Sequence, residues 1–169
     1  MQFSDYTVRQ AQFSDLEAIV AIYNSTVASR QVTADLEPVT VEARIPWFNE
    51  HEHAGRPVYV VLDTQGQVQG WFSFSAFYGR DAYRATCEIS IYLAPECRGK
   101  GWGTRLLTDA EAIAQTLQIN VLLAVIFSHN IPSIRLFQKC NYQHWGELPK
   151  IAEMEQQLYS VTLMGKRID

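Results

Sequence analysis

The segment Asn120–Phe127 is apolar at every position after the first. A run of this length, in which no polar residue alternates with the apolar ones, is typical of a strand that is buried on both faces. Such strands lie in the interior of a sheet that has helices packed against it. This one segment therefore predicts that the chain folds as an α/β domain with residues 120–127 near its centre.

The remaining elements follow from hydrophobic periodicity and from breaker residues. Strands are predicted at residues 6–11, 58–63, 68–77, 86–93, 142–148 and 158–164. Helices are predicted after a capping box of Ser14 and Glu17, over Thr40–Glu50 with a kink or early break at Pro46, after a glycine segment at 98–104, and over Ile131–Lys139. The order β-α-α-β-β-β-α-β-α-β-β indicates a single α/β domain over residues 1–169.

Composition narrows the class of protein. Of the 169 residues, 47% are hydrophobic and 19% are charged, which is ordinary for a soluble globular domain. The formal net charge of −4 argues against general binding to nucleic acids, whose phosphates select basic surfaces. No apolar stretch reaches the roughly 18 residues of a membrane span, and Met1–Tyr6 lacks the pattern of a signal peptide. Cys87, Cys97 and Cys140 have no metal-type or redox-type spacing, so we expect reduced thiols in a cytoplasmic protein.

A glycine-rich segment lies between the predicted strand 86–93 and a long helix, and it reads Arg98-Gly99-Lys100-Gly101-Trp102-Gly103-Thr104. The N-terminus of a helix presents unpaired N–H groups and a partial positive charge, and both attract phosphate oxygens. Glycines let the backbone approach those oxygens closely, and Arg98 and Lys100 add positive charge. The segment therefore predicts a pyrophosphate site. The alternative is a glycine turn that only starts a helix.

Two common nucleotide motifs do not fit this segment. The P-loop has four residues between its glycines and then Gly-Lys-Ser/Thr. The dinucleotide fingerprint has a third glycine where this chain has Leu106. The residues alone thus leave open which pyrophosphate compound is bound.

The stretch Arg98-x-x-Gly101-x-Gly103 resembles the Gln/Arg-x-x-Gly-x-Gly/Ala motif of the GNAT acyltransferases, and it lies between the fourth strand and the third helix, as in that superfamily. Nearly the whole chain is similar to the phosphinothricin and methionine-sulfoximine N-acetyltransferase branch. The supporting residues are Ile22-Tyr23-Asn24 with Val27, Glu37-Pro38, Trp47-Phe48, Arg80-x-x-Tyr83-Arg84-x-x-x-Glu88-x-Ser90-x-Tyr92 and Asn130-x-x-Ser133-Ile134-Arg135-Leu136. The resemblance implies acetyl-CoA as co-substrate and a mixed, mostly antiparallel sheet of about seven strands flanked by about four helices.

The same resemblance implies how the cofactor is held. Backbone groups of Ile91, Tyr92 and Leu93 would pair with the pantetheine arm as if it were an added strand. The amides from Gly99 to Thr104 would hold the pyrophosphate, and Asn130 and Ser133 would contact the cofactor farther along. Lys139 would approach the phosphates or remain a solvated charge at a helix end.

Glu88 is the candidate catalytic base. An amine must lose its proton before it attacks a thioester, and a carboxylate beside the pantetheine contacts can take that proton directly or through water. The alternative is an ordinary strand glutamate. The candidate acceptor-binding residues, chosen for aromatic or guanidinium side chains just upstream, are Phe77, Arg80, Tyr83 and Arg84. Arginine's planar fork suits a carboxylate or phosphinate, although surface ion pairs are an equal alternative for these two arginines.

Two departures from the branch concern the acceptor and the leaving group. Where many GNAT enzymes have a tyrosine that protonates the leaving thiolate, and where this branch commonly has histidine, this chain has Phe137. The stretch Glu153–Ser160 lacks the Trp-Asp pair that the branch carries before its last strand, which indicates a shifted specificity. We expect no metal at His51-Glu52-His53, because histidines two apart on a helix point to different faces.

We therefore expect a cytoplasmic, homodimeric N-acetyltransferase without nucleic-acid or membrane partners. It would pass the acetyl group directly, in a ternary complex, to the primary amine of a small amino-acid-like acceptor of the phosphinothricin or methionine sulfoximine/sulfone type. One alternative is the same chemistry on a polyamine, an aminoglycoside or a protein N-terminus. Those cationic acceptors would favour an acidic pocket. Another alternative is a non-catalytic acyl-CoA-binding module.

Overall fold

The computed structural model describes residues 6–169, and its elements follow the predicted order. The helices are α1 (Leu16–Val27), α2 (Val41–His53), α3 (Trp102–Thr116) and α4 (Ile131–Lys139). The strands are β1 (Thr7–Gln10), β2 (Tyr59–Leu62), β3 (Val68–Ala76), β4 (Thr86–Leu93), β5 (Val121–Phe127), β6 (Gln143–Met154) and β7 (Gln157–Arg167). The expectation about a signal peptide at the N-terminus concerns residues that lie almost wholly outside the described part.

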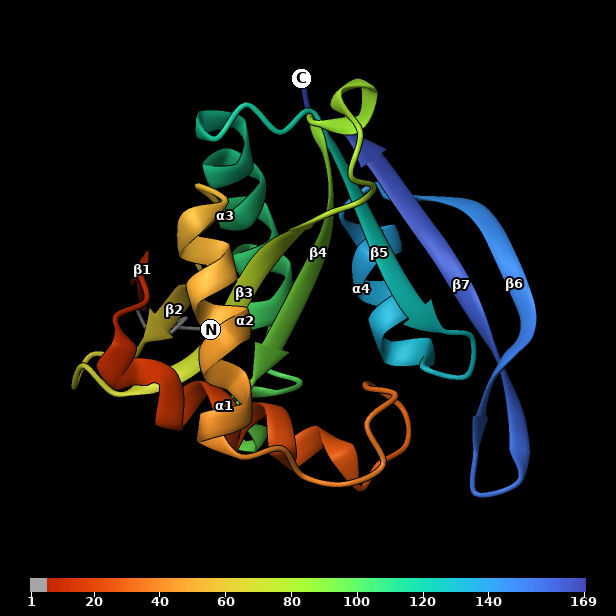
Figure 1. Cartoon of the computed structure of the whole chain (residues 1–169), viewed down its shortest axis with the longest axis horizontal. Helices are drawn as coiled ribbons and strands as arrows, with labels where there is room; N and C mark the ends of the chain where they lie inside the picture. The colour runs from red at the N-terminus through yellow and green to blue at the C-terminus, as the bar shows by residue number, and fades with distance from the viewer. Residues whose placement is uncertain (1–5) are drawn as a thin grey trace.

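The seven strands form one sheet in the order β1-β2-β3-β4-β5-β7-β6. The pair β4–β5 is parallel and the other five pairs are antiparallel. Helices α1 and α2 cover one face of the sheet, and α3 and α4 cover the other (Figure 1). The predicted mixed, mostly antiparallel sheet with four helices is confirmed. None of the helices within residues 6–169 has the length and apolar character needed to cross a membrane.

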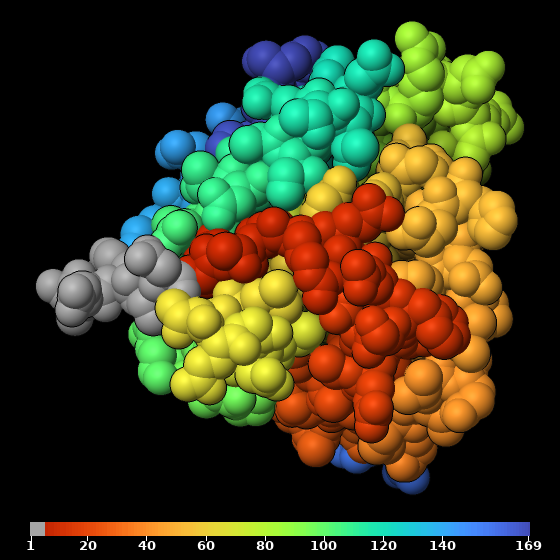
Figure 2. All heavy atoms as spheres, turned by 90° about the vertical axis from the view of Figure 1, so that its left-hand side faces the viewer, coloured from red at the N-terminus to blue at the C-terminus, as the bar shows by residue number. Residues whose placement is uncertain are grey.

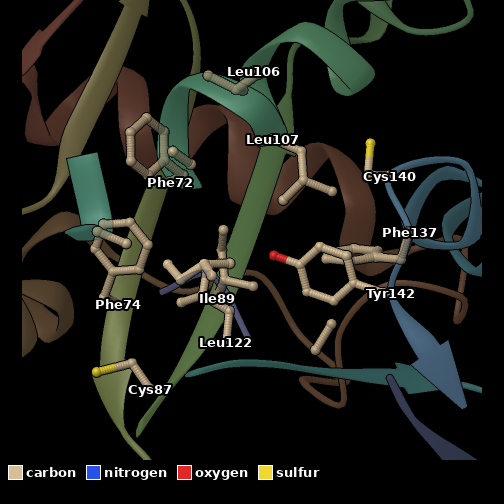
Figure 3. Close-up of a cluster of buried hydrophobic side chains, with 14 of the residues drawn as sticks. Phe72, Phe74, Cys87, Ile89, Leu106, Leu107, Leu122, Phe137, Cys140 and Tyr142 are labelled. Carbon is tan, nitrogen blue, oxygen red and sulfur yellow. The ribbon is translucent and has the colours of Figure 1, made fainter. Parts of the chain in front are cut away.

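Each face of the sheet buries its own apolar cluster. Phe72, Phe74 and Ile89 pack with α3 and α4, together with Leu106 and Leu107 (Figure 3). On the opposite face, the apolar sides of α1 and α2 pack against Val58, just before β2, and against residues of β2 and β3 that include Val60 and Trp71. Alternation along the strands therefore decides which side chains face which pair of helices. The site described below depends on this division.

The N-terminal segment packs against α3. The hydroxyl of Tyr6 donates a hydrogen bond to Asp109 at 2.6 Å, and the Arg105 guanidinium lies 4.3 Å from the centre of the Tyr6 ring. The Tyr6 ring also contacts Trp102 in the first turn of α3, at 5.1 Å between ring centres. Figure 2 shows this segment, in red, lying against the teal surface of α3. The contacts stabilise the first turns of the helix that follows the glycine segment.

Two predicted helix features are wrong. The capping box of Ser14 and Glu17 is absent, because a 3-10 turn over Phe13–Asp15 precedes α1 and Asp15 accepts the N–H of Gln12 at 2.7 Å. Helix α2 does not end at Pro46 but continues to His53. Pro46 is on an exposed side of the helix, so the backbone carbonyl that loses its intrahelical partner there can be hydrated.

The last two strands are longer than predicted. Strand β6 continues from Leu148 to Met154 through a register shift before Ala152, and Lys150 there has a φ of 51°. Most β6 side chains are exposed, so no buried apolar alternation marks this continuation in the sequence. With β7 it forms a long hairpin that projects from the sheet (Figure 1).

Asp15 connects β1 to the start of α1. Its side chain is 8% exposed, accepts the Gln12 N–H and forms an ion pair with Arg9 at 2.7 Å. Hydrogen bonds from Arg9 and from the Gln12 backbone hold the pKa of the Asp15 carboxyl below its ordinary value. A carboxyl whose folded-state pKa is lowered stabilises the fold above its unfolded pKa, and this contribution disappears as the pH falls through the folded-state value.

We predict that Asp15→Ala lowers the free energy of unfolding by about 1–3 kcal/mol at neutral pH, because Arg9 and the Gln12 N–H lose their acceptor. Urea denaturation at several pH values measures this, and the difference from wild type should shrink below pH ~4. Asp169→Ala, which removes an exposed carboxylate bound to Arg167, should leave the urea midpoint unchanged. An equal loss of stability at neutral and strongly acidic pH would contradict the prediction.

Candidate active site

The parallel strands β4 and β5 pair only at their beginnings. The register joins Thr86 to Val121, Cys87 to Leu122 and Glu88 to Leu123, and it extends no further along the two strands. Beyond Glu88, β4 stays paired with β3 on its other side as far as Leu93. The sheet therefore opens between β4 and β5, at its centre.

A pocket occupies this opening. It is lined by four successive β4 residues, Ile89–Tyr92, and by Ala124–Ile126 of β5. Asn130, Ser133 and Phe137 of the α4 region complete the lining, together with Val32 from the loop between α1 and α2. Phe137 is buried, and its ring packs edge-on against Tyr142 with the ring centres 4.9 Å apart (Figure 3). The pocket wall contributed by Phe137 is therefore apolar.

Strand alternation shows which backbone groups face the opening. The Ala94 N–H donates to Gln69 O on the β3 side, whereas Ala85 O accepts from Val121 N on the β5 side. Since successive residues of a strand point their backbone groups to opposite sides, those of Ile91 face the opening and those of Tyr92 face β3. The predicted contact of pantetheine with the Tyr92 backbone is therefore wrong, because that backbone pairs with Trp71 in the sheet.

The guanidinium of Arg98 binds the protein itself. Its Nε donates to Leu93 O at 2.9 Å, and one terminal nitrogen donates to Ser25 Oγ at 2.7 Å. The Leu93 carbonyl, which is on the β5 side of the strand, thus already has a donor. Arg98 therefore connects the end of β4 to α1 and positions the glycine segment that follows.

The glycine segment ends at the N-terminus of α3. Gly99 and Gly101 have φ values of 70° and 85°, and Gly101 is the N-cap residue. These left-handed conformations are accessible to glycine with little strain. A shallow hollow beside this helix end is lined by Gly101, Thr104, Arg105, Thr108 and Lys139. Free N–H groups and cationic side chains therefore meet at one place, which suits a phosphate group.

Gly103, the third glycine of the segment, is required for helix packing. A Cβ on Gly103 would lie 3.1 Å from Leu136 Cδ2, so Gly103 allows α3 and α4 to pack closely. Trp102 is buried between them and the N-terminal segment. The predicted roles of Gly103 and Trp102 in cofactor binding are therefore limited to their backbone N–H groups.

Asn130 connects α4 to the loop between α1 and α2. Its Oδ1 accepts the Ser133 N–H at 3.2 Å, and its Nδ2 donates to Gln31 O at 3.1 Å. The side chain is 5% exposed and lines the pocket. Asn130 is the cap of α4. Its second bond holds Gln31 next to Val32 at the opening, and the sequence did not indicate this second contact.

The loop over residues 28–40 is bound at several further points. Arg30 forms an ion pair with Glu155 at the tip of the β6–β7 hairpin at 2.9 Å, and its carbonyl lies 2.8 Å from a ring nitrogen of His129. Both amide atoms of Asn24 bond to the backbone of Val39 at 2.9 Å. The loop is thereby connected to α1, to the β5–α4 turn and to the hairpin. Nothing in the local sequence pattern predicts these long-range contacts.

Glu88 lies where β4 and β5 begin to separate, on the α1–α2 face of the sheet. Alternation places it on the same side of β4 as Ser90 and Tyr92, since Cys87 and Ile89 belong to the opposite core. Burial raises the pKa of the Glu88 carboxyl above its ordinary value. A carboxylate of increased basicity thus lies next to the pocket, which suits a proton acceptor.

Aromatic rings continue from Glu88 along this face. The Trp71 and Tyr92 rings stack with centres 4.4 Å apart, and Tyr23 lies 5.3 Å from Tyr92. The Arg44 guanidinium is 4.3 Å from the centre of the Tyr23 ring and 3.5 Å from Asp35. The sequence pattern does not predict these contacts of Arg44, because the partners come from α1 and from the α1–α2 loop.

The predicted acceptor residues Phe77, Arg80, Tyr83 and Arg84 lie together in the loop between β3 and β4. Phe77 and Tyr83 are exposed and pack edge-on at 5.8 Å between ring centres. The Arg80 guanidinium lies 6.0 Å from the ring of Tyr78, and the Arg84 carbonyl accepts from Arg56. None of the four lines the pocket between β4 and β5. The loop leads into β4 two residues before Glu88, so these residues remain candidates for the outer part of the site.

The two histidines considered for metal binding point to different partners. His51 Nε2 lies 3.4 Å from Ser75 Oγ, and His53 Nδ1 lies 2.6 Å from Asn49 O. Within residues 6–169, no group of three or more His, Cys, Asp or Glu side chains is arranged to hold a metal ion.

Comparison with known proteins shows similarity over almost the full chain. The chain is 52% identical over 162 residues to the Bacillus subtilis protein named "Putative phosphinothricin acetyltransferase YwnH", and the match covers 96% of this chain and 99% of that protein. It is 30% identical over 163 residues to the L-methionine sulfoximine/L-methionine sulfone acetyltransferase of Pseudomonas aeruginosa, with 96% and 95% covered. The solved structure of a phosphinothricin acetyltransferase from Sinorhizobium meliloti in complex with acetyl-CoA matches with a TM-score of 0.89 at 31% identity, covering 96% of this chain and 88% of that one.

The family model described as Acetyltransferase (GNAT) family matches residues 19–142. This range contains the divergent strands, the glycine segment and the Asn130 turn. The chain therefore belongs to the GNAT family of acetyl-CoA-dependent N-acetyltransferases.

Proposed function

We propose that this N-acetyltransferase transfers the acetyl group of acetyl-CoA directly to the primary amine of a small amino-acid-like acceptor, with Glu88 as the general base. One observation carries the proposal: the sheet opens between β4 and β5 immediately beyond Glu88, a carboxyl whose pKa is raised by burial. The named substrates of the relatives, phosphinothricin and methionine sulfoximine or sulfone, support an amino-acid-like acceptor.

The geometry supports transfer within one ternary complex. The hollow at the start of α3 is on the α3–α4 side of the sheet, and Glu88 faces the α1–α2 side. An arm of acetyl-CoA lying along Ile91 would bring the thioester to the opening while the amine approaches from the other side. Glu88 takes a proton from the ammonium, and the amine nitrogen bonds to the thioester carbon. The C–S bond then breaks to release CoA, and the nitrogen gives up its second proton to water to become the amide.

The position at which relatives carry an acid for the leaving thiolate holds an apolar side chain in this pocket. Phe137, which lines it, cannot donate a proton, and the pKa of the nearby Tyr142 hydroxyl is raised by burial in the core. We propose that the proton held by Glu88 or a proton from water neutralises the thiolate.

We predict that Lys139→Ala weakens binding of CoA by about two- to tenfold, because this side chain lines the hollow at the N-terminus of α3. Isothermal titration calorimetry at two salt concentrations measures the effect, which should be smaller at high salt. Lys150→Ala on the exposed hairpin is the matched control and should bind CoA like wild type. Equal affinities for all three proteins would place the phosphates elsewhere.

We predict that Glu88→Gln lowers kcat/KM by about 10²–10⁴-fold and leaves CoA affinity unchanged, because the amide cannot accept the ammonium proton. Release of the CoA thiol with a panel of amines measures this, using Glu17→Gln on the exposed side of α1 as control. In wild type, kcat/KM should fall as the pH drops through the raised pKa of Glu88, since the base must be ionised. Full turnover by Glu88→Gln at neutral pH would show that Glu88 is not the base.

The same assay decides among acceptors. Phosphinothricin and methionine sulfoximine should react faster than spermidine, an aminoglycoside or a peptide with a free N-terminus. A preference for the cationic acceptors would overturn the substrate class. Tight CoA binding without turnover of any amine would instead indicate a binding module.

We also propose that two copies of the chain associate through the β6–β7 hairpin. Strand β6 is an outer strand of the sheet, and Trp145, Leu148, Ile151 and Leu158 on the hairpin are exposed. An exposed edge strand with apolar side chains is unfavourable in water unless it is covered.

We predict that Ile151→Asp converts a dimer to a monomer, which sedimentation velocity would detect as a halved mass. Phe13→Ser, which changes an exposed apolar residue far from the hairpin in sequence, is the control and should remain dimeric. A monomeric wild-type protein would refute the proposal directly.

A further inference from the structure

We propose that His51 is a positioning residue for acetyl transfer, which acts through Ser75 by directing its hydroxyl proton either toward the imidazole or toward the carboxylate of Glu88. The inference rests on the proposed role of Glu88 as the base. It concerns a histidine to which the family comparison assigns no function and at which we expect no metal.

The His51 ring is held in one orientation. It lies in the last turn of α2, is 6% exposed and packs against Trp47 with the ring centres 4.8 Å apart. Its Nδ1 is 3.0 Å from Trp47 O, and its Nε2 is 3.4 Å from Ser75 Oγ. Because a carbonyl oxygen only accepts hydrogen bonds, Nδ1 carries a proton in both charge states of the ring. The charge state therefore decides whether Nε2 accepts a proton from Ser75 or donates one to it.

Ser75 is the direct cross-strand neighbour of Glu88. The β3–β4 register pairs the two residues, and side chains of such a pair lie on the same face with Cβ atoms about 4.5–5.5 Å apart. A serine hydroxyl has one proton to donate. When His51 is neutral, that proton is donated to Nε2. When His51 is protonated, Nε2–H donates to Ser75 Oγ and the hydroxyl proton is free to turn toward Glu88.

Both consequences of protonating His51 favour the ionised form of Glu88. The hydroxyl supplies a donor to the carboxylate, and the imidazolium adds a positive charge on the same side of the sheet. Glu88 thus remains an ionised base at a lower pH than it would with a neutral residue at position 51.

The other charges around His51 do not replace this partner. On α2 itself, Glu52 accepts from Gln10 of β1, and His53 is exposed and bonds to Asn49 O. The Arg56 guanidinium donates to Arg84 O, and its backbone N–H donates to His51 O at 3.0 Å. From the sheet, the Ser75 hydroxyl contacts Nε2, and Glu88 is the strand neighbour of Ser75.

The test is the pH dependence of kcat/KM for acetyl transfer to the best acceptor. In His51→Gln the acidic limb should move to higher pH by about 0.5–1.5 units, because Glu88 loses a stabilising charge and donor. Ser75→Ala should also move the acidic limb to higher pH. When His51→Gln is added to Ser75→Ala, the further shift should be only that caused by loss of the imidazolium charge. His53→Gln is the matched control: it removes an equivalent i→i−4 contact on the same helix and should leave the profile unchanged.

A second measurement keeps the test valid if His51→Gln folds poorly. NMR titration of the imidazole in wild type and in Glu88→Gln should show that His51 loses its proton at lower pH in the variant, since coupling between two sites is reciprocal. Superimposable pH profiles of wild type and His51→Gln, or an unchanged His51 titration, would refute the inference while Glu88 remained the base. Full activity of Glu88→Gln would instead refute the base on which the inference depends.

Discussion

The early end of the β4–β5 pairing is the constraint on which the whole site depends. A parallel pair within a sheet normally continues, because each further residue adds hydrogen bonds. Here the pairing stops at Glu88 and Leu123, and the backbone groups of Ile91 are left facing an open pocket. The unpaired strand edge costs stability in the protein alone. The edge gains hydrogen bonds only when a ligand with amide groups lies along it, and the pantetheine arm of acetyl-CoA is such a ligand.

The opening also brings together parts of the chain that are far apart in sequence. Arg98 fastens the end of β4 to Ser25 of α1, which sets the direction in which the glycine segment leaves the sheet. Asn130 caps α4 and holds Gln31 from the opposite face of the sheet. Each side of the pocket is therefore fixed by a residue with a polar side chain and two partners. Loss of either contact would alter the relative placement of donor and acceptor, even though neither residue takes part in the chemistry.

Local features of the fold could be predicted from the sequence, and long-range ones could not. The apolar run at 121–127 and the glycine segment mark a central strand and a helix start through residue type alone. The continuation of β6 past Leu148 carries no such mark, because its side chains face water.

The same limit applies to the site. Glu88 could be predicted because it lies in a family motif. The contacts of His51 and Arg44 depend on how the helices pack over the sheet, which the local sequence does not show. The bond from Arg98 to Leu93 O could not be predicted from the sequence either, because a long side chain can point in several directions and the tertiary fold selects one of them.

The three cysteines have a consequence for an enzyme that handles a thioester. Only a thiolate attacks a thioester efficiently, and burial raises the pKa of the Cys87, Cys97 and Cys140 thiols. All three are buried, so the protein's own sulfur atoms are both protonated and out of reach. Transfer of the acetyl group to one of these three thiols is therefore disfavoured, and the thioester is preserved for the acceptor amine.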